Sequence, residues 1–153
     1  MIGIRFTYIA KNAGQHFLGL LLNAVNIEDF IWQIDESDIY ILPCKSNDYL
    51  FNSAIIDGYS FKNTINQKRY FVVSCSLKAY PSWGSVKDLS TYKDYVNSDC
   101  QMIVVITDNQ FVTILAKKDI MIKNIETKIK NYSISLSMEY ITELDDDRYL
   151  TNI

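Results

Sequence analysis

The chain has few of the residues from which most catalytic and metal sites are built. It contains one histidine, His16, and three cysteines, Cys44, Cys75 and Cys100, whose spacing matches no metal-binding motif. Its five glycines form no phosphate-binding loop. Base catalysis by a lone histidine needs a partner that the sequence does not name, and the apolar neighbours of Cys75 make its thiol unreactive. We therefore expect no metal and no cofactor, and the sequence favours a non-enzymatic role.

Positive charge and long apolar runs are also scarce. The net charge is −3 and the lysines are dispersed, so the basic surface that nucleic-acid binding requires is missing. No stretch reaches the roughly 18 apolar residues of a membrane-spanning helix, and Met1 is followed by an alternating pattern rather than an apolar leader. An odd cysteine count fits thiols kept reduced in the cytosol. These features predict a cytoplasmic protein that binds neither nucleic acid nor membrane.

The length and composition are those of one globular domain. The chain has 153 residues, of which 48% are hydrophobic and 22% are charged, which is enough to bury a sizeable core. We expect this single domain to span residues 1–142. Residues 143–153 have no hydrophobic periodicity, and we expect a flexible tail there.

Seven segments have the apolar patterns of strands, namely residues 2–8, 30–34, 39–42, 70–77, 102–106, 111–115 and 134–140. The segments 70–77 and 102–106 are apolar or small on both faces, as in interior strands. Polar residues at 35–38 and 108–110 predict two antiparallel hairpins. Residues 50–56 are ambiguous, with a further strand as one interpretation.

Four segments favour helices. They begin at positions with helical apolar spacing or capping side chains, namely Ala13, Ser60, Thr91 and Asp119. Strictly alternating strands and helices would favour a parallel sheet, whereas two hairpins favour an α+β domain. We expect a mixed, largely antiparallel sheet with three to four helices packed on it.

The loop after the interior strand 70–77 is the strongest candidate for a site, because ligands favour the carboxyl ends of strands in sheets with crossover connections. Trp83 could stack on a ligand, Lys78 and Lys87 could bind an anion, and Asp88 could orient either. The predicted ligand-binding residues are Lys78, Tyr80, Trp83, Lys87 and Asp88. The alternative is that Trp83 covers the edge of the core and the lysines are solvated.

An exposed apolar patch is a second candidate. Leu18 and Leu22 lie one helical turn apart and away from the centre of the predicted apolar stripe. If they are not covered by another element, they form a contact surface for a protein partner or a second copy. The alternative is that both pack beneath a neighbouring element.

Two groups of carboxylates could attract a hard cation such as calcium or magnesium. They are Asp35, Glu36 and Asp38, and Glu143 with Asp145, Asp146 and Asp147. Neither group has the regular, glycine-turned spacing of an EF-hand loop. We expect the first group to be a hairpin tip and the second to be part of a solvated tail, and we expect neither to bind metal.

Three tracts resemble a small family of single-domain proteins of unknown function from Bacillus and related Firmicutes. They are WQIDESDIYIL at 32–42, SLKAYP at 76–81 and TYKDYVNSDC at 91–100, and the resemblance extends over most of the chain. It implies a cytosolic bacterial setting. It assigns no activity, cofactor or catalytic residue.

The sequence favours a non-enzymatic cytosolic protein that binds another macromolecule, either a protein partner or a second copy of itself. An inhibitor or immunity-type factor is one such role, because a small acidic domain complements the charge of a basic toxin. The competing hypothesis is a small-molecule-binding protein or enzyme whose site lies within residues 78–88. That hypothesis requires a pocket with convergent polar groups in this loop.

Overall fold

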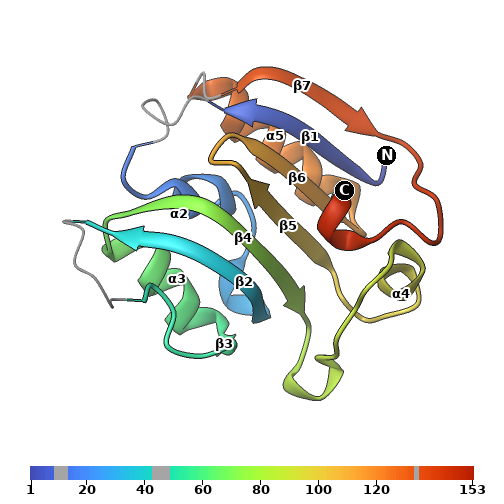
Figure 1. The fold of residues 1–153 in the computed structure, drawn as a ribbon, viewed down its shortest axis with the longest axis horizontal. Coiled ribbons are helices and arrows are strands. Elements are labelled where there is room, and N and C mark those ends of the chain that lie inside the picture. The colour runs from blue at the N-terminus through green and yellow to red at the C-terminus, as the bar shows by residue number, and fades with distance from the viewer. Residues whose placement is uncertain (9–13, 43–48, 133–134) are drawn as a thin grey trace.

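The computed structural model describes residues 1–8, 14–42, 49–132 and 135–153 (Figure 1). Seven described strands form one sheet in the order β3-β2-β4-β5-β6-β1-β7, and all neighbouring pairs are antiparallel. The strands are β1 (Gly3–Tyr8), β2 (Ile31–Ile41), β3 (Ile55–Asp57), β4 (Tyr70–Tyr80), β5 (Met102–Thr107), β6 (Phe111–Ala116) and β7 (Ser135–Ile141). The helices are α2 (Phe17–Leu22), α3 (Gly58–Gln67), α4 (Tyr92–Val96) and α5 (Asp119–Asn131). The predicted single α+β domain is confirmed.

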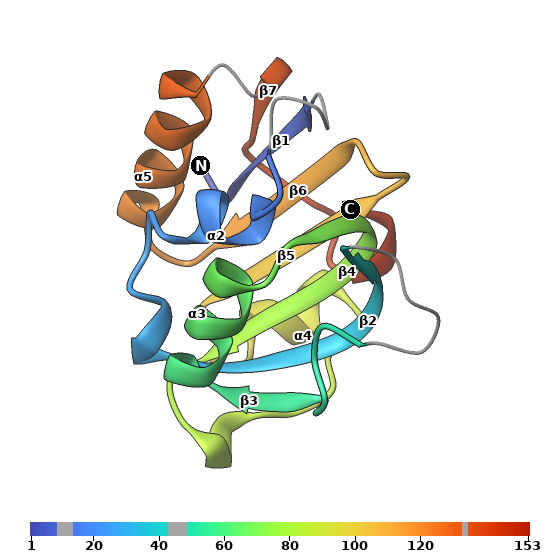
Figure 2. The ribbon, with the colours of Figure 1, turned by 90° about the vertical axis from the view of Figure 1, so that its left-hand side faces the viewer.

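The two faces of the sheet are covered by different parts of the chain. Figure 2 shows α2, α3 and α5 on one side, which we call the helix face, and α4 with the C-terminal turn η3 (Leu150–Asn152) on the other, which we call the tail face. Successive strand residues alternate between these faces. In β5, Val104 therefore belongs to the core of the helix face and Ile103 to that of the tail face.

The helix face carries the larger apolar core. Trp32 of β2 is completely buried and stacks on Phe61 of α3 with ring centroids 4.4 Å apart, and its indole nitrogen donates to the carbonyl of Ile27 at 3.0 Å. Helices α2 and α3 approach so closely at Gly19 that a Cβ there would lie 2.4 Å from the side-chain oxygen of Asn66. Close approach of this kind is a reason for glycine inside a helix.

Leu18 and Leu22 are not on the surface. Both are completely buried in the core of the helix face, because α2 lies between α3 and α5 and is covered from both sides (Figure 2). The contact patch predicted at these two leucines is therefore wrong. Their offset from the centre of the apolar stripe reflects a helix that is enclosed on more than one side.

Residues 30–42 do not form the predicted hairpin. They form one continuous strand, β2, which pairs with β4 from Ile31 to Ile41. The polar residues that suggested a turn lie at two register shifts, after Ile34 and after Asp38. A β-bulge inserts an extra residue into one strand and bends it without ending it, which explains why a polar run occurs within a strand.

The hairpin between β5 and β6 is confirmed. Its turn contains Asp108 and Asn109, both with positive φ angles of 51° and 61°, as a tight turn between twisted strands requires. Strands β4, β5 and β7 also agree with the predicted patterns, as does α5. The ambiguous segment 50–56 contributes the short edge strand β3, while Ala13, Cys44 and Ile134 lie outside the described residues.

Two helix starts illustrate the local rules. The capping box at Thr91 is present, since its hydroxyl accepts from the amide of Asp94 and the Asp94 carboxylate accepts from the amide of Thr91 at 2.9 Å. Helix α3 begins earlier than predicted: Asp57 is the cap and accepts from the amide of Ser60 at 3.0 Å. Among the described helices, none is long and apolar enough to cross a membrane.

The C-terminal segment, residues 143–153, is not the flexible tail that its sequence predicted. Leu150 is buried, and its amide donates to the carbonyl of Ser90 at 2.9 Å. The amide of Tyr92 donates to the carbonyl of Arg148 at 2.8 Å, and the Thr113 hydroxyl donates to the carbonyl of Ile153. Backbone hydrogen bonds and a few apolar anchors attach this segment to the sheet, although it lacks any periodic pattern.

Candidate functional site

A cluster of polar side chains lies on the tail face of β2 and β4. Gln33 of β2 is opposite Lys78 of β4, and Glu36 is opposite Ser76. Asp35 is the extra residue between these two pairs, at the first bulge of β2. The bulge places the Asp35 carboxylate against the Lys78 ammonium, and the two form an ion pair. The bulge thus turns the Asp35 side chain toward Lys78, whereas in a regularly alternating strand it would point to the opposite face of the sheet.

Lys78 is the most deeply buried charged residue of the described chain, with 4% of its surface exposed. Burial lowers the pKa of the Lys78 amine, and the nearby Asp88 carboxylate opposes that shift. A buried ammonium is costly unless a partner compensates it, and Asp35 is that partner. The pair therefore depends on the bulge in β2.

The loop after β4 is tied down over this cluster. The Tyr80 hydroxyl donates to the backbone carbonyl of Lys87 at 2.6 Å and lies 3.3 Å from the side-chain oxygen of Gln33. The Gln33 amide nitrogen donates to the Asp88 carboxylate at 3.0 Å. Burial raises the pKa of Tyr80, so this phenol stays protonated and acts as a donor. The strand and the loop that follows it form one hydrogen-bonded unit.

These elements enclose a pocket of about 280 Å³, which we call the Lys78 pocket. Its sheet side consists of Asp35, Glu36, Ser76 and Lys78, while residues 88–90 of the loop and 149–151 of the C-terminal segment form the other walls. Ser76 is 8% exposed, and no side-chain hydrogen bond to it occurs within the described residues. The pocket combines a polar floor with the apolar side chains of Leu89 and Leu150.

The structure brings together part of the predicted site. Lys78, Tyr80 and Asp88 belong to the cluster, and Lys87 contributes its backbone carbonyl while its side chain is exposed. Trp83 does not line the pocket and is 59% exposed, so a stacking role there has no structural support.

Sequence reasoning missed Asp35, Glu36, Ser76 and Tyr149 as pocket residues. The two acids were assigned to a hairpin tip, and Tyr149 to a solvated tail. No local sequence signal places Tyr149 at the same pocket as Lys78, because its position depends on where the C-terminal segment packs.

The histidine and the two described cysteines do not belong to the Lys78 pocket. The Nδ1 atom of His16 lies 2.7 Å from the carbonyl oxygen of Lys68, to which it donates. Burial raises the pKa of both Cys75 and Cys100 to about 12, so neither thiol is an activated nucleophile. Within the described ranges, no group of His, Cys, Asp and Glu side chains is arranged to hold a metal ion.

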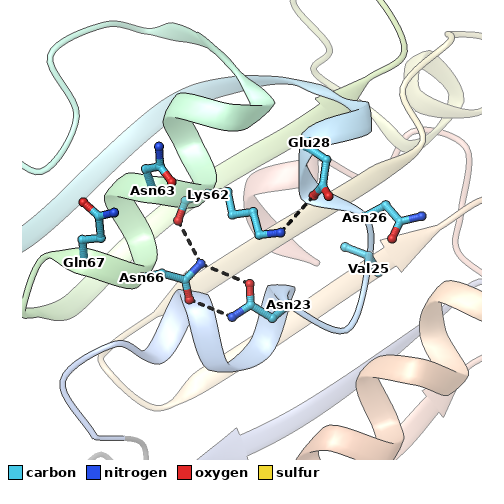
Figure 3. Close-up of a pocket in the computed structure, with 8 residues that line it drawn as sticks. All are labelled: Asn23, Val25, Asn26, Glu28, Lys62, Asn63, Asn66 and Gln67. Atoms are coloured by element: carbon cyan, nitrogen blue, oxygen red, sulfur yellow. Dashed lines mark hydrogen bonds and ion pairs between the residues drawn. The ribbon is translucent and has the colours of Figure 1, made fainter.

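A second pocket, of about 360 Å³, lies at the junction of α2 and α3 (Figure 3). Its side chains are engaged with one another: Asn23 and Asn66 exchange two amide hydrogen bonds of 2.7 and 3.1 Å. Lys62 approaches Glu28 at 3.4 Å. Because these groups satisfy each other across the gap, we interpret this pocket as a polar junction between helices rather than a ligand site.

Comparison with known proteins gives a family and no activity. A family model described as "Protein of unknown function (DUF2691)" matches residues 1–151. The chain belongs to the DUF2691 family. The matched region includes most of the C-terminal segment.

The chain is also similar to a curated protein of Bacillus subtilis, "Uncharacterized protein YncE". The two are 28% identical over 138 residues, which covers 87% of this chain and 88% of that protein. No solved structure matches the chain. The resemblance to a family of unknown function in Bacillus is thus confirmed, and the function has to be argued from the site itself.

Proposed function

We propose that this protein binds a small molecule in the Lys78 pocket and acts in the cytoplasm. The observation that carries the proposal is the ion pair between the buried Lys78 ammonium and the more exposed Asp35 carboxylate at the wall of a pocket. The cytoplasmic setting is supported by two buried free thiols, Cys75 and Cys100, which suit a reducing compartment.

An ion pair whose ammonium group is buried contributes little to the stability of the fold. Replacing such a pair by apolar residues of similar volume is often neutral or stabilising, because desolvation costs offset the attraction. On the same face, Ile103 and Leu115 show that apolar side chains pack well beside it. Charges retained at a pocket despite this cost are a recognised mark of functional sites.

The surroundings of the pair fit a small ligand. The volume of about 280 Å³ is near the lower end of small-molecule sites, which are roughly 300 to 1,000 Å³. Two of its walls come from connecting segments, residues 88–90 and 149–151, and binding residues are often carried by loops on a rigid sheet.

The test is a thermal-shift screen of the full chain against a metabolite panel, repeated with Lys78→Met. A ligand that binds only the folded state raises the melting temperature. We expect at least one compound to do so for the parent protein and to shift the variant by a clearly different amount, because Lys78→Met changes the charge of the pocket. Lys87→Met is the matched control, because its side chain is exposed outside the pocket. Hits that respond equally to both variants, or no hits, would contradict the proposal.

A protein partner or homodimer is the second candidate function, and an inhibitor or immunity-type role belongs to it. The observation in its favour is an exposed aromatic pair on the tail face: Tyr40 and Phe71 are directly opposite in β2 and β4, with 50% and 37% exposure. Tyrosine and phenylalanine are enriched in interfaces. Light scattering coupled to size-exclusion chromatography tests self-association. A monomer at all concentrations, for both the parent and Phe71→Ser, would exclude the homodimer.

A further inference from the structure

We propose that the ligand of the Lys78 pocket is a small cation, an amine or guanidinium group on a short alkyl chain. This inference rests on the proposed small-molecule function and specifies the chemistry of the ligand. It reverses the sequence-based hypothesis that Lys78 and Lys87 bind an anion.

The charge balance of the pocket is negative. Its lining contains three carboxylates, on Asp35, Glu36 and Asp88, against the single ammonium of Lys78, which leaves a net charge of −2. The Lys78 charge is already compensated by Asp35. Lys87, the other cation of the loop, is exposed and does not line the pocket. An anionic ligand would lie beside the carboxylates of Glu36 and Asp88, whereas a cationic ligand would offset their charge.

Acceptor atoms remain for such a cation. Glu36 makes no hydrogen bond or ion pair with the described part of the chain, and Asp88 uses one carboxylate oxygen for Gln33. An ammonium is a donor with no acceptor capacity, so it needs oxygen atoms of this kind around it. Hydrogen bonds between ionised groups are also stronger than neutral ones.

Ser76 offers a further acceptor at the floor of the pocket. It is more than nine-tenths buried, it lines the floor of the pocket, and its hydroxyl has no hydrogen-bond partner among the residues that the structure describes. The hydroxyl is not sealed from the pocket, unlike the enclosed Tyr95 hydroxyl, so it is available to a ligand atom or to solvent. Its oxygen accepts a hydrogen bond from an ammonium without any rearrangement of the floor.

The outer part of the pocket suits the rest of such a ligand. Tyr149, on the C-terminal segment, lines the pocket with 61% of its surface exposed, and an aromatic ring attracts a cation placed over its face. Leu89 and Leu150 present apolar surface for an alkyl chain. Carboxylates together with an aromatic ring form the combination that recognises organic cations rather than metal ions.

The experiment uses three probes of equal chain length: cadaverine, pentane-1,5-diol and glutarate. Binding to the full chain is followed by the amide NMR signals of Ser76, Lys78 and Ser90, and affinity is measured by calorimetry. We expect cadaverine to shift these signals saturably and to bind at least about tenfold more tightly than glutarate or the diol, because only the cation pairs with the carboxylates.

Single substitutions test whether cadaverine binds through the carboxylates of the pocket. Glu36→Gln and Asp88→Asn should each weaken cadaverine binding by about tenfold, while both keep an oxygen that can accept a hydrogen bond. Asp38→Asn is the matched control, since it removes the same charge from the same strand outside the pocket, and it should change affinity by less than about twofold. Tyr149→Ala should weaken binding, and Tyr149→Phe should retain most of it.

The outcomes separate the two proposals. If glutarate or the diol binds the pocket as tightly as cadaverine, the cation inference fails and the small-molecule function stands. If cadaverine binding is unaffected by Glu36→Gln and Asp88→Asn, the inference also fails. If none of the three probes shifts the pocket signals of the well-folded protein at millimolar concentration, the result counts against the proposed function itself.

Discussion

The helix face and the tail face of the same sheet are built on different principles. The helix face is covered by three helices, and its core, which includes Trp32 and Ile129, is almost wholly apolar. The tail face is covered by a short helix, a loop and the C-terminal segment, with Lys78 and Gln33 buried beneath them. The comparison indicates that the helix face provides stability, whereas the tail face gives up some stability to hold a polar site.

Removing the central side chain of the helix face should cause the largest loss of stability. Trp32→Ala should lower the free energy of unfolding by about 4 kcal/mol, because it leaves a large cavity against Phe61. Tyr40→Ala is the control, since it lies on the same strand and points to the tail face with half of its surface exposed. It should cost less than about 0.5 kcal/mol in urea unfolding. Similar losses of unfolding free energy for both variants would contradict the view that the helix face provides the stability.

The second prediction concerns the stability of variants of the Lys78–Asp35 ion pair on the tail face. Asp35→Asn leaves the buried Lys78 ammonium with a neutral partner, and because Asp35 itself is partly exposed the loss of stability should be about 1 to 2 kcal/mol. The double variant Asp35→Asn, Lys78→Met should recover most of this loss, because no unpaired charge remains. Asp38→Asn serves as the exposed control for denaturant unfolding. If the double variant is as unstable as the single one, the pair is structural rather than a cost accepted for function.

The third prediction uses one buried cysteine in each core to report how fast that face of the sheet opens. Burial raises the pKa of Cys75 on the helix face and of Cys100 on the tail face to about 12, so both react only when the structure opens. In single-cysteine variants, with Cys44 replaced by serine, Cys100 should be labelled about tenfold faster than Cys75, because its cover is smaller. Leu150→Ala should accelerate Cys100 further and leave Cys75 unchanged. Equal labelling rates in the parent background would show that both faces open together.

The smallest expected effect separates the two pockets. Asn66→Ala removes both amide contacts to Asn23 at the junction of α2 and α3 and should cost about 1 kcal/mol of stability. It should leave cadaverine affinity unchanged, because the Lys78 pocket is on the other face. Calorimetry on this variant measures that directly. A loss of affinity would indicate that the polar junction is coupled to the site.

The elements with strong periodicity were predictable because local and tertiary preferences agree in them. The hairpin of β5 and β6 follows from apolar runs around Asp108 and Asn109, and α5 follows from its apolar stripe. Three predictions failed where tertiary packing overrides local pattern. Bulges kept β2 continuous through a polar run, neighbouring helices covered Leu18, and backbone hydrogen bonds docked a C-terminal segment that has no periodicity.

The candidate site was predictable only in part for the same reason. Lys78, Tyr80 and Asp88 follow one another along the strand and its loop, so position after an interior strand identified them. Asp35 and Tyr149 come from segments more than 40 residues to either side of Lys78. No sequence pattern encodes their meeting, because it depends on a bulge in one segment and on the docking of the other.

By itself, the sequence determined the fold class, the interior strands and the scarcity of catalytic residues, because hydrophobic periodicity and composition act locally. Tertiary packing determined which charges are buried, which carboxylates share a pocket with Lys78, and that residues 149–151 form one of its walls. Burial and charge balance are properties of segments brought together in space, so no single stretch of sequence encodes them.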